Sequence, residues 1–179
     1  MVILKKGTSL RVSSDNLRAL AETIFQKRGV PKKDAVLVAD ILIEANLRGH
    51  DSHGVIRIPN WIKGLDCGAL KPACQPSVVR DKGATALLHG DSGLGPVVAK
   101  KATDLVLQKA KNFGVGLVSV RKASHIGILQ YYSQWLAENG VIGIVLTNTE
   151  PGVAPFGSRQ QILGTNPLTI SVPSAGTPY

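Results

Sequence analysis

The sequence predicts an α/β protein in which a helical N-terminal segment precedes a mixed α/β region. Two patterns carry this prediction. Apolar residues recur at helical spacing up to about residue 66, and after Gly68 short β-type runs alternate with helical ones. The composition, with 44% hydrophobic and 18% charged residues among 179, is globular rather than disordered or fibrous. We therefore expect a helical segment over residues 1–75 and an α/β region over 76–179.

The helical segment is expected to contain three helices. The first is predicted over Ser13–Arg28, with a serine as its N-cap and Gly29 as its stop. The second is predicted over Pro31–Arg48, because a proline loses no hydrogen bond in the first turn of a helix. The third is predicted over His53–Asp66, where Pro59 is expected to kink or interrupt it.

The α/β region is expected to open with a hairpin around Lys82-Gly83 and then to alternate helices and strands. The run Val141–Leu146 is continuously apolar, which predicts a buried strand, and the alternation favours some parallel pairing. Nothing in the sequence after the last strand can pack against it, so we expect a longer parent chain or a partner to supply that layer. The predicted elements are strands Ser77–Asp81 and Thr85–Leu88, helix Gly95–Lys111, strand Gly114–Val120, helix Ile128–Asn139, and strands Val141–Leu146 and Ile162–Val172.

The charge and cysteine content exclude several classes of protein. The formal net charge is +9, but the basic residues are scattered and aromatic residues make up 4%, which argues against nucleic-acid binding. No apolar stretch approaches the roughly 18 residues that span a bilayer, so we expect no membrane association. Cys67 and Cys74 lack zinc-site spacing and form no disulfide framework, which predicts a reduced, metal-free chain. A cytoplasmic location is expected, while the basic, acid-poor start leaves a mitochondrial presequence open.

The densest polar cluster is Arg48-Gly49-His50-Asp51-Ser52-His53-Gly54, followed by Arg57 and Trp61. If this segment is helical, His53, Arg57 and Trp61 lie near one face at spacing i, i+4 and i+8. A guanidinium can hold a carboxylate with two hydrogen bonds, while an imidazole moves a proton near neutral pH. The alternative is structural, with Asp51 or Ser52 capping a helix whose histidine and arginine are merely exposed.

Three further polar clusters occur in the second half of the chain, and the first two of them follow predicted strands. Ser124-His125-Ile126-Gly127 stands where ligands often bind in α/β sheets, although a lone histidine such as His125 is more commonly a hydrogen-bonded loop residue. The clusters Thr147-Asn148-Thr149-Glu150-Pro151 and Gly164-Thr165-Asn166-Pro167 suit ribose or phosphate contacts but equally suit turns. The turn Gly93-Leu94-Gly95 lacks the third glycine of a dinucleotide-binding fingerprint.

Four motifs occur in one order along the chain. They are A-x-x-x-G-H-D-S-H-G-V-x-R-x-P at Ala45–Pro59, S-H-I-G at Ser124–Gly127, T-N-T-x-P-x-V-A-P-F-G at Thr147–Gly157 and L-G-T-N-P-L at Leu163–Leu168. Together they resemble the malate/L-lactate dehydrogenase family of the non-Rossmann type. The resemblance implies an L-sulfolactate dehydrogenase-like, non-Rossmann fold. It also implies an NAD- or NADP-dependent oxidoreductase that interconverts 2-hydroxy and 2-keto acids by hydride transfer, and a homodimer.

The resemblance also implies roles for individual residues. His53 matches the active-site histidine of the family, and Arg57 matches the arginine that holds the substrate carboxylate. His125 matches the histidine of the S-H-x-G motif, a proton acceptor in some members and a candidate cofactor contact, so either histidine is a candidate acid/base. The remaining matches are Thr149 at a nicotinamide-cofactor contact, and Thr165 and Asn166 in the substrate-side turn.

The chain departs from the family pattern in three ways. Trp61 stands where a tyrosine is common, and Gly93-Leu94-Gly95-Pro96 replaces a G-x-G-Q turn. Family members are roughly twice this length, so we expect residues 76–179 to be a partial cofactor-binding domain, truncated at its C-terminus. The alternative function is therefore a truncated, non-catalytic homologue that acts as a binding or dimerisation module.

Overall fold

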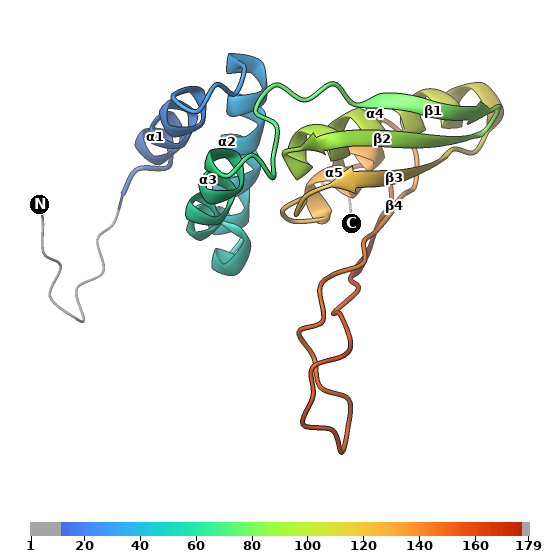
Figure 1. The fold of residues 1–179 in the computed structure, drawn as a ribbon. Helices are drawn as coiled ribbons and strands as arrows, with labels where there is room; N and C mark the ends of the chain where they lie inside the picture. The colour runs from blue at the N-terminus through green and yellow to red at the C-terminus, as the bar shows by residue number, and fades with distance from the viewer. Residues whose placement is uncertain (1–11, 177–179) are drawn as a thin grey trace, which may run out of the picture.

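The fold is that of a computed structural model, which describes residues 12–176. Three helices form its N-terminal part: α1 (Ser14–Gln26), α2 (Lys32–Leu47) and α3 (Ile58–Asp66). Figure 1 shows them grouped on one side of the molecule, with the strands and the other helices on the opposite side. None of the helices among the described residues is long and apolar enough to cross a membrane.

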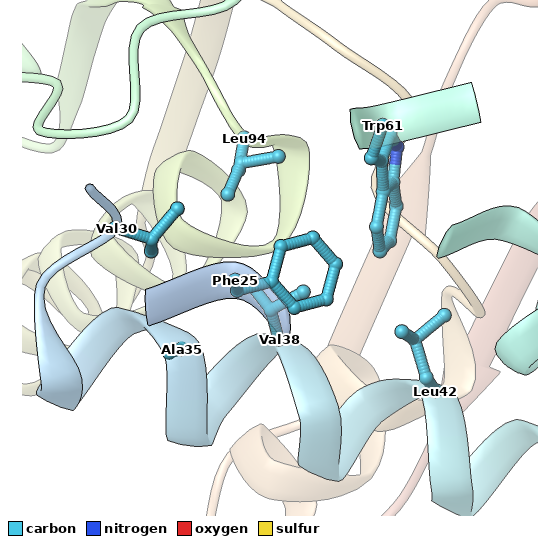
Figure 2. Close-up of a cluster of buried hydrophobic side chains, with 7 residues drawn as sticks. All are labelled: Phe25, Val30, Ala35, Val38, Leu42, Trp61 and Leu94. Carbon is cyan, nitrogen blue, oxygen red and sulfur yellow. The ribbon is translucent and has the colours of Figure 1, made fainter. Parts of the chain in front are cut away.

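The three N-terminal helices share one hydrophobic core, which Figure 2 shows in close-up. The rings of Phe25 and Trp61 lie 6.1 Å apart between centroids and join α1 to α3. Leu94, from the turn after the second strand, is almost fully buried in the same core. Burial of this leucine attaches the sheet region to the helices through the hydrophobic effect. The buried members are Phe25, Val30, Ala35, Val38, Leu42, Trp61 and Leu94.

A three-stranded sheet follows the helices. Its order is β1 (Ser77–Lys82), β2 (Thr85–Gly93) and β3 (Leu117–Ala123), with β1 antiparallel and β3 parallel to β2. The crossover between β2 and β3 is α4 (Gly95–Phe113), which packs against both strands. This parallel unit needs a crossover because the end of β2 lies at the opposite end of the sheet from the start of β3.

A second, two-stranded sheet lies beyond α5 (Gln130–Glu138). The strands β4 (Gly143–Leu146) and β5 (Leu168–Ser171) pair antiparallel, from Gly143 opposite Ser171 to Leu146 opposite Leu168. The segment 147–167 between them extends away from the body of the molecule as an arm, drawn in orange-red in Figure 1. An isolated bridge between Val153 and Leu163 holds the two sides of this arm together.

The structure confirms the predicted α/β class, the hairpin, the parallel pair and the order of elements. The predicted stop at Gly29 is confirmed by its φ of +79°, a conformation that a glycine adopts without strain. Residues 1–11, where a presequence was left open, lie outside the described residues.

Three predictions about elements are wrong. His53–Asp66 is not one helix: two 3₁₀ turns, η1 (Asp51–His53) and η2 (Val55–Arg57), precede α3, because Gly54 between them is extended with φ −85° and ψ −150°. Pro59 therefore lies in the first turn of α3 and kinks nothing. Val141–Leu146 is not a buried strand, since Ile144 and Leu146 are 55% and 68% exposed. The predicted strand Ile162–Val172 shortens to β5, because Asn166 has a φ of +41° and Pro167 follows it.

Candidate functional site

The predicted His53–Arg57 cluster lies in the two 3₁₀ turns between α2 and α3. Asn46 of α2 holds both turns. Its side-chain amide donates to the Asp51 carboxylate at 2.6 Å, and its oxygen accepts the Val55 backbone N–H at 2.9 Å. A Cβ on Gly54 would overlap the Asn46 amide, so a glycine is required there. These contacts of the Asn46 side chain, which we call the Asn46 buttress, fix the path of the backbone that carries His53 and Arg57.

Ser52 orients both functional side chains of these turns. Its hydroxyl hydrogen-bonds Nδ1 of His53 at 2.9 Å, and its carbonyl oxygen accepts Nε–H of Arg57 at 2.6 Å. Among residues 12–176, the two terminal guanidinium nitrogens of Arg57 have no hydrogen-bonded partner. They therefore keep the donor pair with which an arginine binds a carboxylate.

His125 lies in the loop between β3 and α5, and this loop is tied to the start of α4. The Ser124 hydroxyl accepts the Gly95 N–H at 2.8 Å and donates to the Gly93 carbonyl at 3.2 Å. A Cβ on Gly95 would overlap the carbonyl oxygen of His125. The buried Tyr132 donates its hydroxyl to the carbonyl of Ile126, which fixes the other end of the loop.

The fold brings the two predicted histidines together. Their ring centroids lie 5.3 Å apart with an interplanar angle of 36°, and the indole of Trp61 lies 6.1 Å from His125. The i, i+4, i+8 prediction is thus wrong in its geometry, because His53 and Arg57 precede the helix of Trp61. The side chains of His53, Arg57 and Trp61 nevertheless lie around the ring of His125, which comes from a distant part of the chain.

Desolvation and neighbouring positive charge both disfavour protonation of this pair. Partial burial lowers the pKa of His53, and the charges of Arg57 and His50 lower it further. For His125, burial among its neighbours lowers the pKa from 6.5 to about 4, with Arg57 and His53 as additional causes. Both imidazoles are therefore neutral at pH 7 in this structure.

The backbone selects the tautomer of His125. The N–H of Gly127 donates to Nδ1 of His125 at 3.2 Å, so this nitrogen carries no proton. The neutral ring then carries its proton on Nε2. Gly127 has a φ of +79°, and a Cβ there would meet Ile41 at 2.7 Å, so the turn that presents this N–H depends on a glycine.

The other predicted residues, Thr149, Thr165 and Asn166, form a cluster at the base of the arm. The amide oxygen of Asn166 accepts the Thr149 backbone N–H at 3.0 Å, and the two threonine hydroxyls lie 3.3 Å apart. A Cβ on Gly164 would lie 2.5 Å from the Thr149 hydroxyl, so the backbone packs closely here. The donors are neutral hydroxyl and amide groups, which suit sugar and carboxamide partners.

A cavity of about 210 Å³ lies between His50 and His53 on one side and β5, the strand that follows the arm, on the other; His125 does not line it. Its walls include His53 on one side and Pro167, next to Asn166, on the other. A larger cavity of about 320 Å³ lies between Lys109 of α4 and the β1–β2 turn, and none of the predicted site residues lines it. The residues that line the first cavity are His50, His53, Gly127, Ile128, Leu129, Gln130, Pro167, Leu168 and Thr169.

The structure adds three residues to those predicted: Asn46, Ser52 and Ser124. Ser52 hydrogen-bonds His53 and Arg57 directly, whereas Asn46 and Ser124 hold the backbone of the segments that carry the candidate residues. Ser52 and Ser124 stand directly before the two histidines in the sequence, which was a usable signal. Asn46 had no such signal, because its role depends on how α2 lies against the 3₁₀ turns.

Comparison with known proteins identifies the family of the chain. The family model described as malate/L-lactate dehydrogenase matches residues 12–179. The chain belongs to the malate/L-lactate dehydrogenase family. Within the family, it is 46% identical over 157 residues to an L-sulfolactate dehydrogenase of Methanocaldococcus jannaschii, covering 88% of this chain and 46% of that one. It is 42% identical over 170 residues to a malate dehydrogenase of Pyrococcus abyssi, covering 95% and 47%.

Solved structures of the family have the same fold. A malate dehydrogenase from Pyrococcus horikoshii superposes with a TM-score of 0.92 at 40% identity, covering 99% of this chain and 52% of that one. The sulfolactate dehydrogenase of M. jannaschii superposes with a TM-score of 0.86 at 45% identity, covering 89% and 46%. The predicted sulfolactate dehydrogenase-like fold is therefore confirmed.

The chain spans about half the length of the curated relatives it matches. Over residues 12–176, no group of three or more histidine, cysteine, aspartate or glutamate side chains is arranged to hold a metal ion. Cys67 and Cys74, which are exposed and buried respectively, are both free thiols.

Proposed function

We propose that the chain is part of an NAD(P)-dependent oxidoreductase that interconverts a 2-hydroxy acid and a 2-keto acid of the malate or lactate type. The observation that carries this proposal is the convergence of Arg57, His53 and His125 around one point. Membership in a family of hydroxy-acid dehydrogenases supports it. A carboxylate-binding guanidinium beside a proton-transferring imidazole is the arrangement that a 2-hydroxy acid requires.

In this proposal Arg57 binds the substrate carboxylate. The bond from its Nε to the Ser52 carbonyl leaves the two terminal nitrogens directed to a ligand. Burial is the main cause of the lowered pKa of both histidines, and the charge of Arg57 adds to it; a bound carboxylate neutralises this second contribution. Substrate binding thereby raises the proton affinity of the pair at the moment when a proton has to move.

The histidine pair moves the proton of the substrate oxygen. With Nδ1 of His125 engaged by Gly127, its Nε2–H is a hydrogen-bond donor to that oxygen in the substrate-free state. His53 has a more adaptable partner, because the Ser52 hydroxyl can either donate to Nδ1 or accept from it. We therefore assign proton transfer to both rings, with His53 free to change tautomer.

The residues at the base of the arm are proposed ligand contacts. The nicotinamide cofactor, NAD or NADP, supplies or accepts the hydride when bound. The hydroxyl of Thr149 fits a sugar or carboxamide group of such a cofactor, and His125 is the second proposed contact with it. Thr165 and Asn166 are proposed on the substrate side, because Pro167 lines the cavity beside His53.

Three further expectations are also proposed here, of which the homodimer rests on the family resemblance and the other two on the sequence pattern. They are a homodimer, a cytoplasmic location, and a division of the chain at residue 75. The stretch between the end of α3 and the start of β1 supports that division.

Binding of a 2-oxo acid to the chain itself tests the proposal. Oxalate, an analogue with adjacent carboxyl groups, is expected to shift the imidazole resonances of His53 and His125 in NMR spectra. Arg57→Ala should weaken binding about tenfold or more, because a charge-assisted bidentate contact is lost. Arg80→Ala, on the exposed strand β1, is the control and should bind as the wild type does.

Catalysis is tested in a chimera in which this chain replaces the matched part of the P. abyssi malate dehydrogenase. Oxidation of NADH or NADPH is followed with oxaloacetate, pyruvate and sulfopyruvate. We expect activity that falls about 100-fold or more in His53→Ala, as for loss of a general acid or base. A folded chimera that is silent with every acid and both cofactors, together with an unchanged oxalate titration in Arg57→Ala, would refute the proposal in favour of a binding module.

A further inference from the structure

The helix α2 contacts the segments of both candidate histidines. Near its end, the Asn46 buttress holds the turns that carry His53. Nearer its middle, the Asp40 carboxylate accepts the hydroxyl of Tyr131 at 2.9 Å. Tyr131 stands in the first turn of α5, directly after the loop of His125. Asp40 and Asn46 lie about 9 Å apart along the helix axis, at a rise of roughly 1.5 Å per residue, so one rigid element contacts both segments.

The bond between Asp40 and Tyr131 has no equivalent elsewhere in the site. Among residues 12–176, no other hydrogen bond joins α2 to residues 124–138, which we call the His125 segment. Ser124 bonds the start of α4, and the Tyr132 hydroxyl bonds a carbonyl within the His125 segment itself. The polar attachment of this segment to α2 therefore depends on one bond.

Apolar packing beside this bond brings the His125 segment close to α2. Ile41, next to Asp40, is fully buried, and a Cβ on Gly127 would lie 2.7 Å from its side chain. Gly127 and Tyr131 belong to the same segment, so loss of the hydrogen bond also loosens this close contact.

The chemistry of the two partners makes the bond a strong one. The guanidinium of Arg18 lies 3.2 Å from the other carboxylate oxygen of Asp40, and a hydroxyl that donates to a carboxylate forms a stronger bond than one between neutral groups. Burial raises the pKa of Tyr131, and the bond to Asp40 raises it further, so the hydroxyl stays protonated and remains a donor. The ring of Tyr131 packs edge-on against Tyr132, with centroids 5.6 Å apart, which fixes its direction.

We propose that Asp40 and Tyr131 are positioning residues, whose hydrogen bond holds His125 at its distance from His53. Without this bond the His125 segment is free to move away from α2, which carries the support of His53. The two rings then no longer converge on one substrate oxygen, and small displacements of reacting groups are costly. The importance of the pair for catalysis rests on the proposed function, whereas the separation of the two rings does not.

NMR spectra of the 179-residue chain test this role. Tyr131→Phe deletes only the hydroxyl and keeps the ring that packs on Tyr132. We expect the nuclear Overhauser effect between the two imidazoles to weaken. We also expect the titration midpoint of His125 to rise from about 4 by about one pH unit or more, because the ring gains water. The charged and titratable groups that act on His125 are Arg57 and His53, and both are unchanged in this variant.

Substitutions of Asp40 separate the hydrogen bond from a general loss of stability. Asp40→Ala removes the acceptor and should raise the midpoint of His125 as Tyr131→Phe does. Asp40→Asn keeps an oxygen that accepts the Tyr131 hydroxyl, so it should retain the wild-type midpoint and Overhauser effect. A merely structural role would lower the free energy of unfolding but would move neither signal of the folded protein.

Gln134→Ala is the matched control. It removes the hydrogen bond from Gln134 to Glu138, which has a length of 3.1 Å and lies within α5, so both signals should stay as in the wild type. Three results would overturn the proposal: unchanged signals in Tyr131→Phe and Asp40→Ala, an equal rise of the midpoint in Gln134→Ala, or identical behaviour of Asp40→Asn and Asp40→Ala.

Kinetics of the malate dehydrogenase chimera separate this proposal from the proposed function. Tyr131→Phe should lower kcat about tenfold and leave KM for the keto acid nearly unchanged, because Arg57 is untouched. If the midpoint of His125 shifts as expected but the wild-type chimera is silent, the proposed function fails and the positioning role stands. If the chimera is active and Tyr131→Phe changes neither kcat nor the midpoint, the positioning role fails and the proposed function stands.

Discussion

Acidification acts on the stability of the chain through His125. In the unfolded chain this histidine has its ordinary pKa of 6.5, whereas burial lowers the pKa to about 4 in the folded structure. Between these two values the unfolded state binds a proton that the folded state does not. The free energy of unfolding therefore falls as the pH is lowered from 6.5 to 4, and this contribution is fully present above pH 6.5.

The size of the effect follows from the two pKa values. A difference of about 2.5 pH units corresponds to at most about 3.4 kcal/mol, at roughly 1.4 kcal/mol for each unit. His125 remains partly exposed, and solvent screens its interaction with Arg57 and His53. We therefore expect the actual loss to be about 1–2 kcal/mol.

Urea unfolding at pH 7 and pH 4.5 measures this loss. The comparison is with His125→Asn, whose side-chain oxygen can still accept the Gly127 N–H. Carboxylates and the other histidines titrate in both proteins and cancel, so the wild type should lose about 1–2 kcal/mol more than the variant. Equal losses, or an NMR titration of the His125 ring with its midpoint near 6.5, would show that the ring is not desolvated and refute the reasoning.

Two predictions concern the supports of the site. Asn46→Ala leaves the Val55 N–H without its partner and should lower the free energy of unfolding by about 1–2 kcal/mol in urea titrations. Asn60→Ala, at an exposed helical position, is the control. If both variants lower the free energy of unfolding equally, Asn46 does not support the 3₁₀ turns as described. Gly95→Ala places a methyl group against the His125 carbonyl. Such overpacking costs about 1–3 kcal/mol of unfolding free energy, so the melting temperature should fall by several degrees. The matched change Gly152→Ala, where the nearest atom to the new Cβ is 3.8 Å away, should leave it unchanged; the prediction fails if both melt alike.

Much of the fold could be predicted from local pattern. The helices α1, α2, α4 and α5 each carry an apolar stripe between a recognisable start and stop, and these signals are local. The break at Gly54 was missed because a glycine within a helical pattern only weakly opposes a helix. Here Asn46 decides the conformation, since its amide occupies the space of a Cβ at residue 54. A contact from another helix is invisible to periodicity.

The burial of β4 was mispredicted for a different reason. A continuous apolar run such as Val141–Leu146 indicates that a strand has apolar surroundings, but not which polypeptide supplies them. In the site, the motif residues His53, Arg57 and His125 were identified by their chemistry and by the family resemblance. Their convergence could not be predicted, because it depends on how the loop after β3 lies against the helices.

The contact between His53 and His125 also has a consequence for the order in which the chain folds. The rings belong to a helical hairpin and to the end of a parallel strand unit, so their pairing closes a long loop. We expect local contacts within each unit to form first, because long-range closure costs more conformational entropy. An intermediate in which the units have formed but not docked has complete secondary structure and two ordinary histidines. Substitutions that loosen Leu94 in the helical core should therefore separate the imidazoles before any helix melts.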